Sequence, residues 1–558
     1  MDVYSPARRR RTWLGAALVA VPIAGYFALL STASVEVPYL DDYDAVVDFL
    51  LRTLDEDAAS ARLGRLLKLH NEHPMLTLRV AVLGTFAITG GINFGALNAL
   101  GGLLLVGLLA AMFAASTPDT PPAERLLPFA PAALFLIQPQ YWMVLLSATT
   151  SLSSVAVTTW AAVTFVALER DGPLARAIAI LTAAIATFSL ANGILVPWLG
   201  AGVLLLRGRP RAARMMAGLG LVLTAAFAAI VPESPAPNLA AVLASPVRLI
   251  LYVLNFVGGS AGFSRFGWSA VCGALLLTSA GFLVWQGLPR RRPALFALLL
   301  FILGSIGLNA MARAQQGAGA PLLQPRYSFY GAVILATTYL GWAEILRRRR
   351  FAQRAFGATL AIAVVFSLAS FTIHQPDVMR QSRRLDDGLD DWLTRGYSGL
   401  LHLDFRKASH LLIKAYDQQL LVPPRRWIKD YAGEAIQTEL PAVDRSIRMR
   451  IESVYQDDDL AFVSGWAFSG GTARNQEVEI VLRSARAIRV FSAYEVPRAD
   501  LTHLEPERMA SVYGSGFRAV VSKRRVPPGE YRIGILVRRG SHAWLRFGNR
   551  KIYVEKRS

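Results

Sequence analysis

Residues 13–32 read WLGAALVAVPIAGYFALLST, and residues 38–48, a short way on, read PYLDDYDAVVD. The first stretch is long enough to cross the hydrocarbon core of a bilayer as a helix, which takes about 20 apolar residues. The apolar core of a secretory signal is shorter, roughly 7–15 residues, so we expect this segment to remain in the protein as its first transmembrane helix. Asp41, Asp42 and Asp44 then follow close to the membrane, where a carboxylate needs either water or a specific role.

The composition of the whole chain indicates a polytopic, all-α membrane protein. Of its 558 residues, 53% are hydrophobic, and Ala-, Leu- and Val-rich runs of spanning length recur up to residue 371. The mean hydropathy is +0.37. Much of the net charge of +20 lies on arginines in short loops between apolar runs, so we expect membrane lipids as partners and no nucleic acid. The single cysteine, Cys272, excludes an intrachain disulfide.

Arginine-rich segments set the predicted orientation. We expect five such segments to be cytoplasmic: 8–11, 170–176, 207–214, 290–292 and 347–354. An even number of spans must then separate each consecutive pair. This gives about 11 transmembrane helices, with the N-terminus in the cytoplasm and the C-terminus outside. The short segment 248–256 carries an arginine and is expected to be interfacial or re-entrant. This topology places several polar groups at the outer face: the aspartates, Gln138–Trp142, Asn192 and residues 313–326.

The pattern along the chain divides it into three regions. Residues 1–372 form the transmembrane domain, and its long first outer loop, 35–90, contains two stretches, 45–54 and 59–69, with the apolar spacing of amphipathic helices on a membrane surface. Residues 373–444 are polar and helix-patterned, and we expect an outer helical linker. Residues 445–558 change to alternating, β-rich stretches separated by turn signals, which predicts a β-sandwich of about seven strands outside the membrane.

The aspartates differ in what the sequence requires of them. Asp44 or Asp42 suits the N-cap of a helix beginning near Ala45, and Asp44 is the preferred candidate. One cap needs one carboxylate, so Asp41 and Asp42 are either further solvated groups or a general base or metal-holding pair at the boundary of water and lipid.

Two other groups of residues have a similar choice of interpretations. His70-Asn71-Glu72-His73 could bind a divalent cation or relay protons, but the spacing is not HExxH, and Pro74 favours a simple helix end at the surface. Arg326-Tyr327, with Arg313 upstream, could bind a phosphate through bidentate hydrogen bonds. The simpler alternative for these residues is anchoring at the membrane interface. Gln138–Trp142 likewise can be an aromatic belt, and Asn192-Gly193 a helix break between two spans.

These pieces together resemble the GT-C superfamily of membrane glycosyltransferases, which includes protein O-mannosyltransferases, arabinosyltransferases and lipid A aminoarabinose transferases. Bacterial members carry an acidic motif after the first span, an Asn-Glu-His motif before the second and an Ala-Asn-Gly break further on, where this chain has Asp41-Asp42-Tyr43, His70–His73 and Ala191-Asn192-Gly193. The resemblance covers residues 13–371. Tyr43 stands where the family has Trp, and Pro74 where it often has Arg. The C-terminal region is similar to β-sandwich modules appended to bacterial glycosyltransferases.

The resemblance implies inverting transfer of a sugar from a polyprenyl-phosphate donor to a glycan, lipid or protein acceptor, at the outer face of a bacterial inner membrane. A lipid donor agrees with the lack of a nucleotide-binding Gly-rich loop in the sequence. The resemblance also implies that the site residues line one cavity. Asp41 or Asp42 is the base, and Glu72, His73 and His70 serve the acceptor, a proton relay or a divalent cation. The donor phosphate is assigned to Arg326, Arg313 and Arg265, with Tyr327, Asn192 and Gln140 around them.

Two other functions stay open at this point. A transporter or flippase for a lipid-linked glycan would have charged residues near mid-bilayer and repeats of broken helices, whereas the ionisable residues of this chain cluster at helix ends. A non-catalytic envelope-assembly protein could use the β domain to bind a glycan or a partner.

Overall fold

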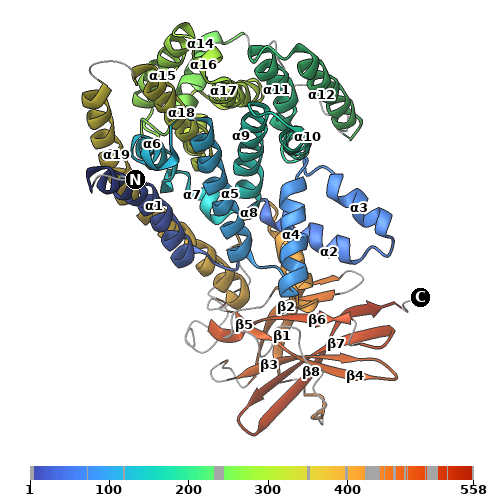
Figure 1. Ribbon diagram of the computed structural model, residues 1–558. Helices are drawn as coiled ribbons and strands as arrows, with labels where there is room; N and C mark the ends of the chain where they lie inside the picture. Colours follow the sequence, from blue (N-terminus) through green and yellow to red (C-terminus); the bar gives the residue numbers. More distant parts are fainter. Residues whose placement is uncertain are drawn as a thin grey trace. The chain divides into compact units, whose positions relative to one another are not determined.

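The computed structural model of the chain forms two compact units (Figure 1). Residues 1–88 with 93–382 make up the helical unit, and residues 89–92 with 383–558 make up the C-terminal unit. The structure describes residues 6–71, 73–116, 120–230, 244–347, 352–395, 400–421, 440–444, 446–456, 460–469, 473, 476–496, 498, 513–523 and 526–555.

The described part of the helical unit is built from helices and short helical turns. Its α-helices are α1 (Pro6–Ala33), α2 (Phe49–Leu54), α3 (Ala59–Leu67), α4 (Leu76–Thr89), α5 (Phe94–Ala115), α6 (Pro122–Leu136), α7 (Trp142–Leu146), α8 (Ala148–Thr150), α9 (Ala156–Leu168), α10 (Pro173–Thr187), α11 (Leu195–Leu206), α12 (Pro210–Ile230), α14 (Pro246–Gly258), α15 (Trp268–Trp285), α16 (Leu288–Arg291), α17 (Pro293–Arg313), α18 (Ser328–Leu346) and α19 (Ala352–Arg395), the last running on into the C-terminal unit. Two segments are π-helical, η1 (Tyr43–Asp48) and η3 (Ser151–Val155), and the 3-10 turns are η2 (Pro139–Tyr141), η4 (Ala191–Ile194), η5 (Ala314–Gln316), η6 (Ala320–Leu323) and η7 (Pro325–Tyr327).

Within the described ranges, nine helices are long and apolar enough to cross a membrane, which makes the chain a multi-pass membrane protein as predicted. They are Arg8–Ala33, Phe94–Ala115, Pro122–Leu146, Ala148–Leu168, Pro210–Ile230, Trp268–Trp285, Pro293–Gln316, Pro325–Leu346 and Ala352–Leu389. The two segments that meet at Asn192-Gly193 are shorter apolar helices, and so is α14, the segment expected not to cross.

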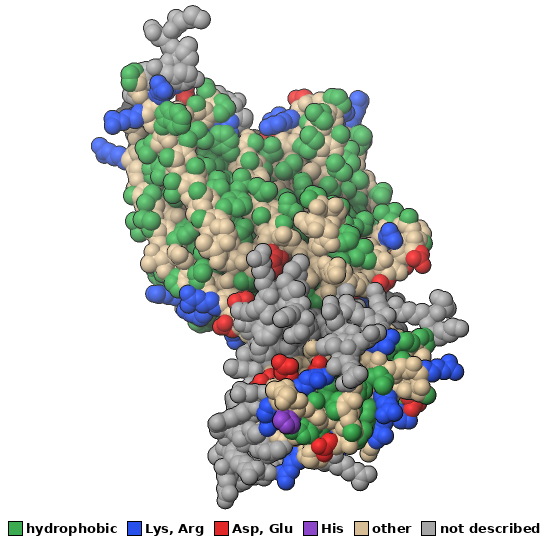
Figure 2. Space-filling view, turned by 90° about the horizontal axis from the view of Figure 1, so that it is seen from below, with side chains coloured by type: hydrophobic (Ala, Val, Ile, Leu, Met, Phe, Trp, Pro, Cys, Tyr) green, Lys and Arg blue, Asp and Glu red, His purple; other side chains and the backbone are tan. Residues whose placement is uncertain are grey.

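Large apolar side chains lie on the outside of these helices. Trp13 is 66% exposed, Leu221 62% and Val365 66%, and Figure 2 shows hydrophobic side chains over much of the visible face of the helical unit. An apolar surface of this extent is rare on a monomeric soluble protein. In a bilayer the same side chains face lipid tails, where they incur no hydrophobic cost.

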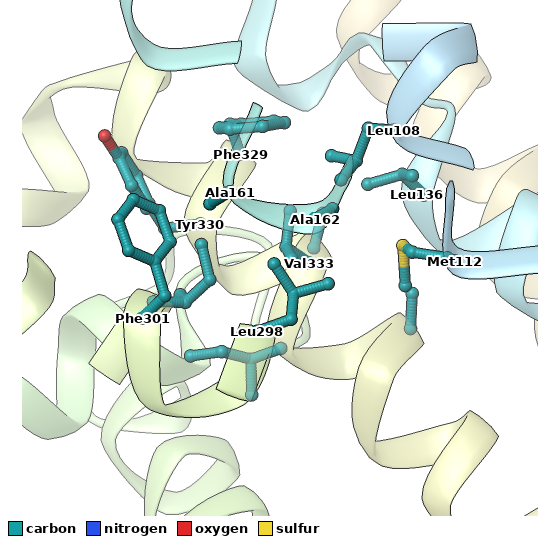
Figure 3. Packing of buried hydrophobic residues seen from close by; sticks show 14 of the residues in the cluster. Leu108, Met112, Leu136, Ala161, Ala162, Leu298, Phe301, Phe329, Tyr330 and Val333 are labelled. Atoms are coloured by element: carbon teal, nitrogen blue, oxygen red, sulfur yellow. The ribbon is translucent and has the colours of Figure 1, made fainter. Parts of the chain in front are cut away.

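The core of the helical unit is formed where α5, α6, α9, α17 and α18 meet. Figure 3 shows side chains from all five helices lying together, among them Leu108, Leu136, Ala162, Leu298 and Val333. Glycine lets α1 approach α6 closely, because a Cβ added at Gly15 of α1 would come within 2.4 Å of the backbone nitrogen of Leu127 in α6.

The predicted first outer loop, residues 35–90, contains the two expected helices, but they differ in their surroundings. The segment η1–α2 buries its apolar face in protein, with Val46 and Leu50 both 0% exposed. The prediction that it lies on the membrane surface is therefore wrong. In contrast, α3 has no buried residue, and Leu63 is 64% exposed. Its apolar side remains open, as a surface helix requires.

The C-terminal unit contains the predicted antiparallel β domain in two sheets. Helix α20 (Phe405–Asp417) precedes it, and its strands are β1 (Arg448–Gln456), β2 (Leu460–Phe468), β3 (Glu477–Arg483), β4 (Ile488–Ser492), β5 (Tyr494–Val496), β6 (Gly516–Ser522), β7 (Gly529–Arg539) and β8 (His542–Val554). One sheet has the order β1-β2-β6-β5 and the other β4-β3-β7-β8. The alternating apolar residues of both sheets form one core, which includes Val463, Ile480, Phe517 and Ile535.

Candidate functional site

Helix direction places the predicted outer residues at one end of the helical unit. α1 and α6 begin side by side, where Thr12 Oγ1 donates to the carbonyl of Ala123 at 3.3 Å. α18 runs in the opposite direction, because Arg347, directly after its end, donates to Thr120 Oγ1, two residues before α6, at 3.4 Å. The aspartates after α1, Gln140 after α6 and Arg326 before α18 therefore share the other end of the bundle.

Asp42 is fully buried and fixed by hydrogen bonds. Its Oδ1 accepts from the backbone N–H of Thr149 at 2.7 Å and from Ser147 Oγ at 3.3 Å, and its Oδ2 accepts from the N–H of Tyr39 at 3.3 Å. Burial raises the pKa of Asp42 to about 6, although these hydrogen bonds act in the opposite direction. The carboxylate thus ties the predicted first outer loop to Ser147, between α7 and α8, and to Thr149 in α8.

Asp41 has a different environment. Its side chain is partly exposed and forms no hydrogen bond or ion pair with any described residue, while its carbonyl accepts from the N–H of Ala45 at 2.8 Å. Leu40, directly before it, has a φ of 50°, an uncommon left-handed conformation for a leucine. Backbone strain of this kind often accompanies functional positions.

The helix after the aspartates begins earlier than the sequence predicts. It starts at Tyr43, so Asp44 lies in its first turn and the prediction that Asp44 is the N-cap is wrong. The first segment, η1, is π-helical and contacts α8, which leads directly into the second π-helical segment, η3. π-Helical turns are frequent at functional sites, and here two of them lie on either side of the Asp42 hydrogen bonds.

The His70–His73 motif forms a tight turn rather than a helix end. The backbones of His70 and His73 exchange hydrogen bonds of 2.9 and 3.0 Å, and Asn71 has a φ of 52°, which asparagine tolerates well. Glu72 lies outside the described residues. Among the described residues no group of three or more His, Cys, Asp or Glu is placed to hold a metal ion.

The segment after this turn lies against the Asn192 turn. The N–H of Leu76 donates to the carbonyl of Phe188 at 2.8 Å, and Thr77 Oγ1 lies 2.6 Å from Ser189 Oγ. Asn192 is buried and donates from Nδ2 to Ser305 Oγ at 2.8 Å. The fold therefore brings the second and third motifs of the resemblance to neighbouring positions, although more than a hundred residues separate them in the chain.

The predicted phosphate-binding residues gather around Tyr327. Its hydroxyl accepts from Arg313 at 3.0 Å and from Asn309 Nδ2 at 3.2 Å, and the Arg326 guanidinium lies 5.3 Å from the centre of its ring. Asn309 in turn accepts from the Tyr252 hydroxyl at 2.7 Å. Asn309 and Tyr252 were not among the residues predicted from the sequence, although a polar side chain inside an apolar helix is itself a signal of function.

Arg265 lies in an exposed loop that reaches the same place. Ser264, its neighbour, lies 3.4 Å from Ser328, two residues after Arg326. None of Arg265, Arg313 and Arg326 forms an ion pair with an acidic residue in the described part of the chain. Three cations without a partner charge make this region attractive to an anion.

Gln140 is buried beside the segment that carries Arg326. It is 3% exposed, and neither its amide nitrogen nor its amide oxygen has a hydrogen-bond partner among the described residues. Its segment, η2, contacts η7, which carries Arg326. No hydrogen bond or ion pair between described residues joins the Asp41-Asp42 motif to the arginines themselves. The two groups share an end of the bundle, and a ligand would have to bridge them.

Comparison with known proteins does not add to this picture. No protein-family model, no curated protein and no solved structure matches the chain.

Proposed function

We propose that this protein is a GT-C-like glycosyltransferase that moves a sugar from a polyprenyl-phosphate donor to an acceptor on the outer face of the membrane. The observation that carries the proposal is the group formed by Arg313 and Arg326 around Tyr327, with Arg265 in the adjoining loop. These cations have no acidic partner among the described residues, and they lie at the bundle end where the aspartate motif begins.

A phosphate leaving group is the ligand that this arrangement suits. Guanidinium groups offer paired N–H donors that match phosphate oxygens. The positions at helix ends also suit a lipid donor, because its polyprenyl tail can stay in the bilayer while the phosphate reaches the arginines. Tyr327 fixes Arg313 and leaves most of its N–H groups available.

In the proposed reaction Asp41 is the general base. Its carboxylate takes the proton of the acceptor hydroxyl as the acceptor oxygen bonds to the anomeric carbon of the sugar. The bond from that carbon to the phosphate oxygen breaks, its electron pair stays on the oxygen, and polyprenyl phosphate leaves with the arginines stabilising its charge. Attack opposite to the leaving group inverts the anomeric configuration.

The two aspartates have separate roles in this proposal. Asp42 is already used by Ser147, Thr149 and Tyr39 and has no access to solvent, so it positions the loop. Asp41 is partly exposed and has no partner among the described residues, so its carboxylate can receive a proton from a substrate.

The test is deletion of the gene, followed by mass analysis of cell-envelope glycans and of polyprenyl-phosphate sugars. We expect one envelope glycan to lose a sugar and the corresponding lipid-linked sugar to accumulate. Wild-type protein should restore the glycan, whereas Asp41→Asn and Arg326→Gln should reduce transfer by about a hundredfold or more at normal protein levels.

Asp57→Asn is the matched control, since Asp57 is an exposed carboxylate of the same outer loop. Full activity of Asp41→Asn would remove the base from the proposal. Deletion of a flippase would instead trap the lipid-linked sugar on the cytoplasmic side, where outer-face labelling cannot reach it. Deletion of an assembly protein would leave every sugar linkage of the glycan present in at least some glycan chains.

A further inference from the structure

A cavity of about 810 Å³ lies at the opposite, arginine-rich end of the helical unit. It is formed by the beginnings of α1, α6 and α19 and the end of α18. Leu127, Trp342, Leu346 and Phe356 supply apolar walls. This end holds the segments that the arginine pattern places at the cytoplasmic headgroups, so the cavity lies at the boundary between headgroups and hydrocarbon.

The walls of the cavity are held in place by contacts among the helices. Trp342 donates from Nε1 to Ser279 Oγ at 2.6 Å and stacks on Phe282, with ring centres 5.3 Å apart. Tyr339, another lining residue, uses its hydroxyl on Pro128. With their polar atoms occupied in this way, Trp342 and Tyr339 present apolar ring surfaces to the space.

The mouth of the cavity is positively charged. Arg8, Arg11 and Arg347 line it, together with one acid, Glu124. Arg8 is paired with Glu124. Arg347 lies 3.9 Å from Glu344, which Arg292 already holds at 2.9 Å. Arg11 is exposed and forms no hydrogen bond or ion pair with the rest of the described chain. Arg11 and Arg347 therefore leave excess positive charge at the mouth of an apolar cavity.

We propose that this cavity binds one lipid with an anionic phosphate headgroup. The phosphate contacts Arg11 and Arg347, and a hydrocarbon chain lies along the apolar walls of α18 and α19. The combination of a guanidinium mouth with an aromatic and aliphatic interior fits an amphipathic anion better than a soluble phosphate, which has no use for the interior. This site is at the other end of the bundle from the proposed transfer site and does not depend on it.

The test uses purified, delipidated full-length protein in detergent. Binding of phosphatidylglycerol and of phosphatidylcholine with the same acyl chains is measured by native mass spectrometry. We expect tighter binding of phosphatidylglycerol, and we expect the double variant Arg11→Gln/Arg347→Gln to weaken it by about tenfold or more. The matched control is Arg9→Gln/Arg10→Gln, which removes the same charge from exposed positions that do not line the cavity.

Ala343→Phe fills the cavity without changing its charge and should also weaken phosphatidylglycerol binding. Because Arg11 and Arg347 are exposed, their double variant should fold even if the phenylalanine variant does not. The proposal is overturned if the double variant binds phosphatidylglycerol like the wild type, if phosphatidylcholine binds as tightly, or if inorganic phosphate alone displaces the lipid at equal concentration.

Discussion

At the scale of single residues, two adjacent aspartates have unlike environments. Asp42 is fully buried and accepts three hydrogen bonds, whereas Asp41 is partly exposed and accepts none through its side chain from the described residues. A buried carboxyl group is a poor proton acceptor for a substrate that cannot reach it, however high its pKa. The pair is therefore better described as one structural and one available carboxylate.

The buried carboxyl group predicts a dependence of stability on pH. The pKa of Asp42 rises from its ordinary value of 3.8 to about 6 on folding, so the folded state binds this proton more tightly than the unfolded chain does. As the pH rises from about 4 to about 6, the protein should lose up to about 3 kcal/mol of stability through this group, with no further loss above that range.

The measurement is thermal unfolding in detergent across this pH range. In Asp42→Asn no proton is released, so the stability of the variant relative to wild type should increase with pH. Asp57→Asn, which changes an exposed group, should follow the wild-type curve. Parallel curves for wild type and Asp42→Asn would show that folding does not raise the pKa of Asp42.

The sequence predicted which residues to consider but not how each would be used. Arg313, Arg326 and Tyr327 lie together because they stand at the ends of consecutive antiparallel helices, and their role in binding a phosphate stays a prediction. The difference between Asp41 and Asp42 depends on Thr149, which is 107 residues away along the chain. Local sequence pattern contains no information on a contact of that range.

At the scale of elements, the loop between α1 and α5 is organised by polar side chains that satisfy helix ends. Glu36 accepts from the N–H groups of Phe94 and Gly95 at 2.7 and 3.0 Å, at the start of α5. A carboxylate is favourable there because of the helix dipole and the unpaired N–H groups. At the other kind of helix end, Arg79 donates to the carbonyls of Arg65 and Leu66 in the last turn of α3 and of Lys68 directly after it.

The Arg79 contact predicts that α3 depends on one side chain. Since α3 has no buried residue of its own, Arg79→Met should let its last turn fray by removing the donors for its final carbonyls. Trypsin should then cleave at Arg62 or Arg65 about tenfold faster than in the wild type, if the lost hydrogen bonds amount to about 1.4 kcal/mol. The rates are read from mass spectra of timed digests.

Two comparisons make this prediction specific. Arg79→Lys keeps a cation that can reach at least one carbonyl and should give an intermediate rate. Cleavage at Arg125, which is buried in α6 of the same unit, should be unchanged in both variants and reports on unfolding of the helical unit. Equal cleavage of α3 in wild type and Arg79→Met would mean that the helix is held by other contacts.

Element types were largely predictable, and element ends were not. The apolar runs and the alternating stretches determine which segments are helices and which are strands. The stretch 488–496 reads as one strand, yet it divides at Ala493, with β4 pairing with β3 in one sheet and β5 with β6 in the other. A strand that changes sheets keeps its alternation, so periodicity alone does not mark the division.

At the scale of the whole molecule, the chain combines two kinds of hydrophobic core. The core of the helical unit runs from Tyr26 to Val378 and is built from helices whose outer surfaces are also apolar. The core of the β domain runs from Ile447 to Ile552 and lies between two sheets. In the described part of the chain these two cores have no residue in common.

Separate cores predict that damage to one unit stays within it. Ile535 is fully buried between the sheets, so Ile535→Ala should destabilise the β domain by about 2–5 kcal/mol. Hydrogen exchange followed by mass spectrometry should show faster exchange in β3 and β7 and unchanged exchange in α17 and α18. Ile302→Ala, at a fully buried position of α17, is the reciprocal variant and should reverse this pattern. If either variant accelerates exchange in both units, the two cores unfold together and the chain is one cooperative structure.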